Sequence, residues 1–432
     1  MGPHTARMDN RWLQTGHNPW KSIMGGDGMQ VQIDNRNPNI VYTGFQFGNY
    51  YRLDLGSGKR KAIQPKHELG ETPYRFNWQT PILLSPHNQD ILYFGGNKLH
   101  RSLNQGDRWE TISDHLTAGG KKGNVAYGTL TSISESPFKF GLLYVGSDDG
   151  MIHMSKDGGG NWENISTSLP KNLWVSRVVA SKHKIGRVYA TLNGYRWDDF
   201  TPYVYKSEDF GKTWVSIGEG LPPAPVNVIT EDPDNENLLF VGTDDGLYAT
   251  LDQGATWHWF QQGIPYVAVH DLVIQPEEKH LVVGTHGRSI YRADISHMQL
   301  LDTEIMNSPL HVFELDKVRH SPRWGNSYST WGKPVTPGLD IVFYSGNSGP
   351  YTAHIRYQDD IVVSEVALEA DKGLNVLSYD LAFSKQGKTD FLKKIKKELK
   401  KAQDGKTYLP KGEYTVELEG KRVAEKVSFT IE

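Results

Sequence analysis

The side chains best suited to chemistry in this sequence are aromatic, basic, acidic and amide groups that lie just ahead of strand-like segments. They are Asp27, Arg75, Asn77, Trp78, Trp174, Arg177 and His270, with Tyr74, Phe76, Tyr127 and Tyr266 near them. Aromatic rings stack on sugar rings or peptide groups, and Arg, Asn and Asp add directed hydrogen bonds. As a set these residues predict a binding site for a glycan or a polypeptide, although each one alone could equally be a core or interface residue.

The sequence carries no signature of a metal site, a cofactor site or a nucleophilic enzyme. It has no cysteine, which excludes disulfides and Cys-based metal or nucleophile chemistry. The HExxH, P-loop, GxSxG and EF-hand patterns are missing. The repeated Asp148-Asp149-Gly150 and Asp244-Asp245-Gly246 fit turns better than calcium ligands. We therefore expect neither a metal nor a cofactor.

Composition points to many short strands and excludes two classes of partner. The chain has 432 residues, a net charge of −3, 44 glycines, 12 tryptophans and 21 tyrosines. Near-neutral charge gives no electrostatic case for nucleic acid. No apolar run is long enough for a membrane span, and the first residues lack the apolar core of a signal peptide. We interpret the chain as a mature product or the C-terminal part of a longer protein, located in the periplasm, at the cell surface or outside the cell.

An eight-residue pattern, [ST]-x-[DN]-x-G-x-x-W, recurs four times at intervals of about fifty residues, which is the mark of a repeat architecture. Its fixed positions are Ser102, Asn104, Gly106 and Trp109; Ser155, Asp157, Gly159 and Trp162; Ser207, Asp209, Gly211 and Trp214; and Thr250, Asp252, Gly254 and Trp257. The acidic or amide oxygen can accept backbone N–H groups inside a turn, and Gly can take the left-handed conformation. The Trp then buries a large apolar face against a neighbouring hairpin.

Six units, each made of short strand-like segments, follow one another between residues 29 and 295. Where a unit contains one of these turns, the turn precedes its last strand. Four antiparallel strands per unit are typical of a propeller blade. We predict a six- or seven-bladed β-propeller over residues 1–299, or the second half of a tandem pair. The fragment Arg11-Trp12-Leu13 could supply outer strands of a further blade.

Residues 300–432 lack the repeat and predict a second, smaller all-β domain. A linker-like passage over 300–334 precedes segments with the period-two alternation of an Ig-like β-sandwich. One short helix is predicted from Thr389 to Gln403, with Thr389 as its N-cap. Its lysines could touch an anionic membrane or polysaccharide, but we favour a solvated face over a packed apolar stripe.

The four turns resemble those of the Asp-box, or BNR-repeat, β-propellers, a group that includes sialidases, xyloglucanase-type glycoside hydrolases and sortilin. The resemblance implies that the Asp-box carboxylates are structural and lie on the blade periphery, away from the ligand. The segments Asn193–Phe200 and Gly284–Arg288 are similar to large Asp-box proteins of Bacteroidetes-type bacteria. Those proteins carry propeller halves followed by an Ig-like tail, and Leu409–Leu418 resembles the last hairpin of FlgD-type Ig-like domains.

The resemblance to xyloglucanase-type hydrolases breaks down at the catalytic residue. The family's general-base Asp lies in a segment similar to Gly44–Arg52, where this sequence has Gln46. An inverting glycosidase needs one carboxylate to activate water and a second as the acid. Gln cannot take that proton, and Asp27 is a replacement candidate that could equally belong to a turn. The Arg triad of sialidases is also missing.

Three hypotheses follow from the sequence. The first is an exported propeller that binds a polypeptide or glycan at its mouth without catalysis, with Asp27, Gln46, Arg75, Asn77, Trp78, Trp174, Arg177 and His270 as candidate ligand-binding residues. The second is a glycoside hydrolase. The third is a structural subunit of a cell-surface complex, paired with an upstream propeller half or another subunit.

Overall fold

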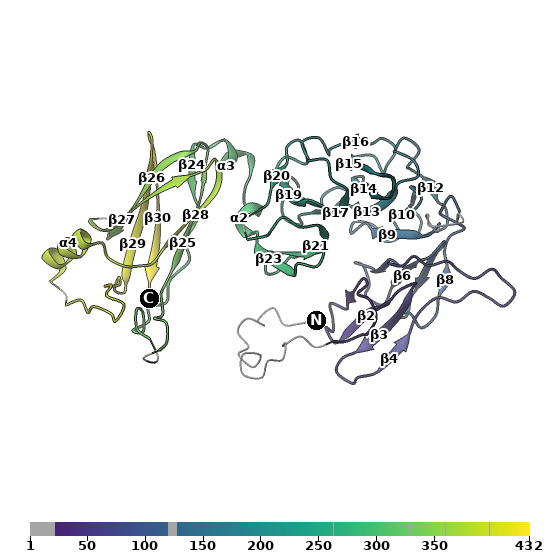
Figure 1. Cartoon of the computed structure of the whole chain (residues 1–432), viewed down its shortest axis with the longest axis horizontal. Helices are drawn as coiled ribbons and strands as arrows, with labels where there is room; N and C mark the ends of the chain where they lie inside the picture. The colour runs from purple at the N-terminus through teal and green to yellow at the C-terminus, as the bar shows by residue number, and fades with distance from the viewer. Residues whose placement is uncertain are drawn as a thin grey trace. The chain divides into compact units, whose positions relative to one another are not determined.

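The computed structural model describes residues 22–119, 128–261, 263–327, 329, 331–358, 360–396 and 398–432. Contacts between Cα atoms divide the chain into two compact units, one ending at Asp294 and the other beginning at Ile295. Both are built mainly of β-strands (Figure 1). The predicted features at Arg11-Trp12-Leu13 and Tyr127 lie outside the described residues.

The N-terminal unit contains, in its described residues, six antiparallel sheets that follow one another along the chain, and we call them blades 1 to 6. Five blades have four strands and the sixth has three, and consecutive strands are always neighbours. Blades 1 to 3 consist of β1 (Gln32–Ile33), β2 (Ile40–Phe45), β3 (Asn49–Asp54) and β4 (Arg60–Ala62); β5 (Ile82–Leu84), β6 (Leu92–Gly95), β7 (Leu99–Ser102) and β8 (Glu110–Thr111); and β9 (Leu130–Glu135), β10 (Leu143–Ser147), β11 (Ile152–Ser155) and β12 (Glu163–Asn164). Blades 4 to 6 consist of β13 (Trp174–Ala180), β14 (Val188–Gly194), β15 (Asp199–Ser207) and β16 (Val215–Ser216); β17 (Val226–Glu231), β18 (Leu239–Thr243), β19 (Gly246–Thr250) and β20 (His258–Trp259); and β21 (Val269–Gln275), β22 (His280–Thr285) and β23 (Ile290–Asp294). The repeated topology is consistent with a β-propeller.

The four Trp-bearing turns each join the third and fourth strands of a blade and share one hydrogen-bond pattern. In blade 3, Ser155 Oγ donates to Asp157 Oδ1 at 2.9 Å and accepts the Gly159 N–H at 2.9 Å. The Asn161 N–H also donates to Asp157 Oδ1, at 2.9 Å. The turns that begin at Ser102, Ser207 and Thr250 repeat these bonds. Two side chains thus hold the turn, and one backbone N–H of each turn also donates to the loop between the first and second strands, as Gly158 does to the Gly141 carbonyl oxygen at 2.9 Å.

The tryptophan of each turn links its blade to the blade before it. The Trp162 indole N–H donates to the Ile112 carbonyl oxygen at 2.9 Å. The other three donate over 2.7 Å, in the pairs Trp109 with Ile63, Trp214 with Ile165 and Trp257 with Ile217. The glycine of each turn packs on the side chain of that same isoleucine. Each isoleucine follows the outermost strand of the preceding blade, so these contacts join blades 1 to 5 in series.

Neighbouring blades also pack through a glycine on the second strand. A methyl group at Gly242 would lie 2.6 Å from Val269 Cγ1 on the next blade, and Gly95 and Gly146 face Leu130 and Val175 in the same way. Figure 1 shows the first strands of blades 3 to 6, β9, β13, β17 and β21, lying one after another, and each of them contacts the next. Glycine is required at these positions because the side chain of the next blade occupies the space of a Cβ.

Blade 6 keeps the corresponding glycine, but no following blade fills its space. The nearest atoms to a methyl group at Gly284 belong to Asp271 of the same sheet, at 3.5 Å or more. On the same face, Val273 and Ile290 are 57% and 62% exposed. This face of blade 6, which we call the blade 6 end face, is therefore uncovered in the described part of the chain.

The C-terminal unit contains two antiparallel sheets around one apolar core. Its elements are α2 (Ser296–Gln299), α3 (Thr303–Asn307), β24 (Leu310–Val312), β25 (Leu339–Ser345), β26 (Gly349–Tyr357), β27 (Ile361–Ala370), β28 (Gly373–Tyr379), α4 (Lys385–Ile395), β29 (Gly412–Gly420) and β30 (Val423–Ile431). Strands β24, β25 and β28 form one sheet, and β27, β26, β29 and β30 form the other. Phe343 of the first sheet and Ile355 and Val416 of the second belong to the same buried cluster. Strand β24 falls within the stretch predicted as a linker, and it pairs with β25 at the sheet edge.

The predicted helix bounds were wrong at both ends. The helix starts four residues earlier than predicted because Ser384, in an extended conformation, accepts the Gly387 N–H with its side chain. Thr389 lies inside the helix, where its hydroxyl donates to the Lys385 carbonyl oxygen. The helix ends at Ile395 because Lys396 takes the left-handed conformation, with φ of 51°.

The glycine packing predicts different responses at two equivalent positions. Gly242→Ala should lower the free energy of unfolding by about 1–3 kcal/mol, because the methyl group must displace Val269 of the next blade. Gly284→Ala, the matched control, should change it by no more than about 0.5 kcal/mol. Urea unfolding of both variants measures the difference. Equal losses would show that the end face of blade 6 is as tightly packed as the interface between blades 5 and 6.

Candidate functional site

A cavity of about 470 Å³ opens where loops of blades 2 to 6 converge. Its lining residues come from the starts of first strands, the segments leading into them, and the hairpins between second and third strands. They are Gln79, Thr131, Trp174, Ser176, Arg177, Asn193, Tyr195, Arg196, Asn227, Asp244, Ala268, His270 and His286. We call this cavity the mouth. In an antiparallel sheet, the hairpin between the second and third strands and the turn between the third and fourth strands lie at opposite ends. The mouth is therefore bounded by the blade ends that lie opposite the Trp-bearing turns.

Three of the eight predicted ligand-binding residues, Trp174, Arg177 and His270, line the mouth. The Arg196 guanidinium lies 4.2 Å from the centre of the Trp174 ring, within the range of a cation–π contact. Arg177 Nη2 pairs with Asp271 Oδ1 at 2.6 Å, which ties blade 4 to blade 6. These contacts hold both guanidinium groups in place at the mouth.

His270 brings a second aromatic surface to the mouth by stacking on His286. The two ring centres lie 5.1 Å apart, with the planes 22° from parallel. Desolvation by the surrounding protein lowers the pKa of His270, although the residue keeps an exposed edge, so its ring is neutral at pH 7. The pair thus offers stacked imidazole rings whose nitrogen atoms can exchange hydrogen bonds with a ligand.

Amide groups form a chain across the mouth that ends on a carboxylate. Asn193 Nδ2 donates to Asn227 Oδ1 at 2.9 Å, and Asn227 Nδ2 donates to Asp244 Oδ1 at 2.8 Å. Asp244 is the single carboxylate among the described residues that line this cavity. The arrangement suits directed hydrogen bonds to a polar ligand, and it lacks the facing carboxyl pair of a glycosidase.

The hairpin between β14 and β15 carries aromatic side chains that sequence reasoning did not place in the site. These strands have seven and nine residues, longer than the second and third strands of the other blades, and the short helix η2 (Tyr195–Trp197) forms the tip. Tyr195, Trp197 and Phe200 are 61%, 44% and 46% exposed. Exposed aromatic groups at a cavity rim are a recognisable signal for ligand stacking. The segment was noted in the sequence only for its resemblance to other proteins.

Asp27 and Gln46 lie outside the mouth and contact each other. The Gln46 amide donates to the Asp27 carboxylate at an exposed position of blade 1. Gln46 occupies the position at which a general base was expected from the hydrolase resemblance. The Asp27 carboxylate therefore accepts a hydrogen bond from an amide group, and this amide cannot act as a general base.

Arg75, Asn77 and Trp78 belong to the segment that leads into blade 2. Asn77 is buried, and its Nδ2 donates to Thr129 Oγ1 at 2.9 Å and to Asp148 Oδ2 at 3.3 Å. Arg75 donates to the Gly128 carbonyl oxygen at 3.1 Å. The hydrogen bonds of these two residues join blade 2 to blade 3. The indole ring of Trp78 is half-exposed and meets the Phe47 ring edge-on, with centres 5.3 Å apart.

Carboxylates of the repeated Asp-Asp-Gly turns bind protein donors. Asp148 accepts the Thr129 N–H at 2.9 Å, and Asp149 accepts the Ser147 hydroxyl at 2.6 Å. Among the described residues, no group of three or more His, Asp or Glu side chains is arranged to hold a metal ion. No helix in the same residues is long and apolar enough to cross a membrane.

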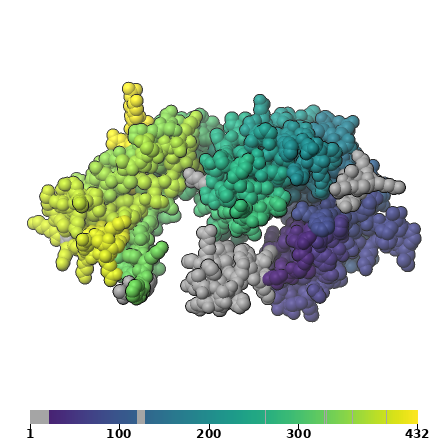
Figure 2. Space-filling model, viewed as in Figure 1, coloured from purple at the N-terminus to yellow at the C-terminus, as the bar shows by residue number. Residues whose placement is uncertain are grey.

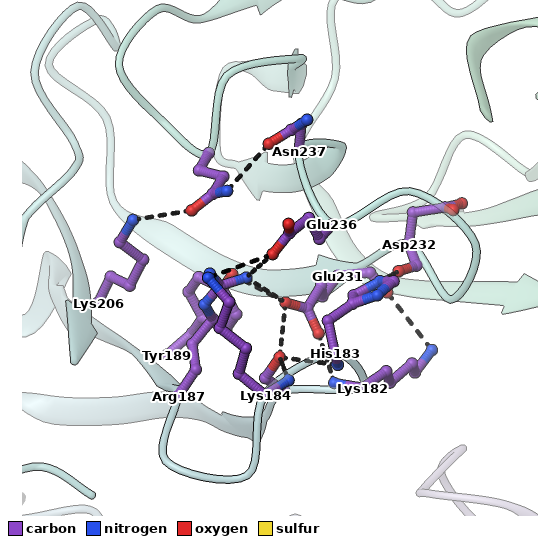
Figure 3. Close-up of polar contacts among 12 residues, drawn as sticks. Lys182, His183, Lys184, Arg187, Tyr189, Lys206, Glu231, Asp232, Glu236 and Asn237 are labelled. Carbon is purple, nitrogen blue, oxygen red and sulfur yellow. Dashed lines mark hydrogen bonds and ion pairs between the residues drawn. The ribbon is translucent and has the colours of Figure 1, made fainter. Parts of the chain in front are cut away.

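Besides the groups at the mouth, titratable side chains also gather in a buried charge cluster between blades 4 and 5 (Figure 3). Arg187 is fully buried, and its guanidinium donates to Glu208 at 2.9 Å and to Glu236 at 3.1 Å. Glu231 is also fully buried and accepts the Tyr189 hydroxyl at 2.9 Å. Figure 3 shows Arg187 and Tyr189 of blade 4 pointing toward Glu231 and Glu236 of blade 5.

The contact between a tyrosine of one blade and a glutamate of the next recurs, which indicates a structural role for the cluster. Tyr93 of blade 2 donates to Glu135 of blade 3 at 2.9 Å, as Tyr189 does to Glu231. Tyr144 is the equivalent residue of blade 3, and its hydroxyl has no partner among the described residues. Burial raises the pKa of Tyr189, which keeps its hydroxyl protonated as a donor.

Comparisons with known proteins find similarity at the level of structure alone. No protein-family model matches the sequence, and no curated protein matches it. The GH74 xyloglucanase from Xanthomonas campestris is 16% identical, with a TM-score of 0.45, over 64% of this chain and 53% of its own. The Niastella koreensis GH74 enzyme is 15% identical, with a TM-score of 0.46, over 92% and 65%. YCF48 from Cyanidioschyzon merolae is 12% identical, with a TM-score of 0.41, over 80% and 94%.

This chain spans about half to two thirds of the length of the two GH74 proteins. All three TM-scores lie below 0.5 and the identities are 16% or less. The function of this chain therefore has to be argued from its own residues.

Two equivalent tyrosines test the structural role of the buried cluster. Tyr189→Phe should lower the free energy of unfolding by about 1–3 kcal/mol, because it removes one hydrogen bond to the buried Glu231 carboxylate, which keeps the Ser181 hydroxyl and the Lys182 N–H as donors. Tyr144→Phe, the matched control, should be neutral or slightly stabilising because it removes a hydroxyl without a partner. Thermal and urea unfolding measure both. A neutral Tyr189→Phe would contradict the structural role.

Proposed function

We propose that this protein binds a glycan or polypeptide ligand at the mouth of its propeller without chemical turnover. The observation that carries the proposal is the composition of the mouth: aromatic rings, amides and fixed arginines around a single lining carboxylate, Asp244. Such a surface stacks on flat ligand groups and orients them by hydrogen bonds. Glycoside hydrolysis by the two-carboxylate route needs an acid and a base on opposite sides of the bond.

The long hairpin of blade 4 supports the same proposal. Tyr195 lines the mouth, and Trp197 and Phe200 are exposed on the same hairpin. A ligand seated on the stacked His270 and His286 could extend along these rings. Rigid aromatic groups with few rotatable bonds lose little entropy on binding, which suits them to recognition. An exported location, at the cell surface, in the periplasm or outside the cell, belongs to this proposal.

Removal of the rim aromatics should weaken binding while leaving the fold intact. We expect Tyr195→Ala/Trp197→Ala to lower the affinity for a glycan or peptide identified on a binding array by at least about tenfold, equivalent to about 1.4 kcal/mol. Phe138→Ala is the matched control, because this half-exposed ring lies in the turn between β9 and β10, at the opposite end of its blade. Titration calorimetry with the array ligand measures both affinities.

The same preparations decide between binding and hydrolysis. Incubation with β-glucans, followed by a reducing-sugar assay, should show no cleavage by the unmodified protein. Cleavage that disappears in Asp244→Asn or Asp27→Ala, with unfolding curves unchanged, would replace the binding proposal with a glycoside hydrolase. Loss of affinity in Phe138→Ala as large as in the rim variant would place the ligand away from the mouth.

A structural subunit is the second candidate, and the blade 6 end face favours it. Val273, Ile290 and the empty space at Gly284 form an apolar surface of the kind that a further blade covers elsewhere in this unit. Blade 1 also exposes Val31 and Ile33. Native mass spectrometry of the protein from its own cells would support this candidate if a second propeller chain were released by Gly284→Leu. A lone chain would exclude it.

A further inference from the structure

The second half of the C-terminal unit carries a strong excess of positive charge. Residues 385–411 contain ten lysines, no arginine and three acidic residues. The rest of this unit, residues 295–384 and 412–432, has nine Lys and Arg against sixteen Asp and Glu. Since the whole chain has a net charge of −3, the lysines mark one segment and do not reflect a generally basic protein.

The structure holds this segment through its apolar side chains and leaves the lysines outside. Phe391 of α4 is fully buried and meets Phe383 and Tyr357, each with ring centres 5.1 Å apart. Gly387 lies against the backbone of Val363 in β27, too close for any Cβ. Both contacts fix the helix on the sheet, so the direction in which its lysines point is set by the fold.

Six exposed lysines form what we call the lysine surface. They are Lys385, Lys393, Lys394, Lys396, Lys400 and Lys401. Lys394 pairs with Asp360 at 2.9 Å and Lys393 with Asp390 at 3.5 Å, while the other four have no ion pair within the described residues. Helix α4 lies at the outside of its unit (Figure 1), and atoms of this yellow-green part of the chain are exposed on the face in Figure 2. Four of the six ammonium groups therefore lie at exposed positions without an ion-pair partner among the described residues.

The burial of the apolar stripe argues against a helix that inserts into a bilayer. Membrane-surface helices bury an apolar face among the lipids. In α4 that face is already used, because Phe391 and Ile395 pack on the core of the unit, and only Leu392 is an exposed large apolar group. The partner must therefore be a polyanion that needs no apolar contact.

The types of side chain distinguish between polyanions. Nucleic-acid binding usually uses arginine forks and aromatic rings that stack on bases. Residues 385–411 have no arginine and no exposed aromatic side chain. Lysine ammonium groups on flexible stems suit carboxylates spaced along a chain, where each contact is a point charge. We propose that the lysine surface binds an acidic polysaccharide, a site separate from the mouth.

The test uses the full chain and polygalacturonate as the probe. We expect binding at 50 mM salt that weakens at least tenfold at 300 mM, because each ion pair replaces bound counter-ions, and no binding to neutral dextran. Lys393→Gln/Lys396→Gln/Lys400→Gln/Lys401→Gln should weaken binding at least tenfold. The matched control, Lys66→Gln/Lys171→Gln/Lys212→Gln/Lys421→Gln, removes the same charge from exposed positions elsewhere and should change it less than twofold.

Unfolding curves of both variants should match the unmodified protein, since none of the eight side chains is buried. Equal losses in the two variants would show a general charge effect and overturn the proposal. It would also be overturned by absence of binding to polygalacturonate, or by tighter binding to vesicles of anionic lipid or to duplex DNA. Binding of an array ligand at the mouth is measured separately, so failure of either proposal leaves the other standing.

Discussion

The N-terminal unit depends on one contact, the bond from a turn tryptophan to an isoleucine carbonyl oxygen of the preceding blade. A small four-stranded sheet cannot bury both of its faces alone, so each blade is stable only against its neighbours. The tryptophan covers apolar surface with its ring and satisfies its own N–H, as Trp162 does with Ile112. The turn glycine on the same isoleucine sets the distance between the blades. Where the turn is missing, in blade 6, the series of contacts also stops.

This arrangement separates stability from recognition along each blade. The Trp-bearing turns use one end of the strands for packing, and the loops at the other end are free to vary in length and chemistry. Blade 4 shows the freedom, because its longer hairpin is accommodated by one register shift, between Leu192 and Gly194, in the pairing of β14 with β15. The mouth is then positioned by rigid strand ends, while Arg177 and Asp271 connect blades that are not neighbours in sequence. A ligand site built this way needs no dedicated domain.

Local signals in the sequence identified the blades and part of the mouth. The remaining features depend on contacts between residues that are far apart in the sequence. The four turns could be predicted because the side-chain hydrogen bonds of their Ser or Thr and Asp or Asn lie within eight residues. Trp174, Arg177 and His270 could be predicted because the start of a first strand always lies near the centre of such a fold. The burial of Asn77 depends on Thr129 and Asp148, which are 52 and 71 residues away. No local sequence pattern predicts it. The helix start was missed because Ser384 and Thr389 are both acceptable caps, and packing of Phe391 and Gly387 on β27 and its surroundings chose between them.

Charge is organised differently in the two units, and this difference bears on what each can bind. At the mouth, Arg177 is paired with Asp271, Arg196 lies on the Trp174 ring and Asp244 accepts from Asn227. A ligand there gains mainly from stacking and hydrogen bonds, whose strength depends weakly on ionic strength. The lysine surface has four ammonium groups without an ion pair in the part of the chain that the structure describes, and its attraction for an anion is screened within about 10 Å at 0.1 M salt. Because the two mechanisms respond so differently to salt, ionic strength alone can separate recognition at the mouth from adhesion through the lysine surface.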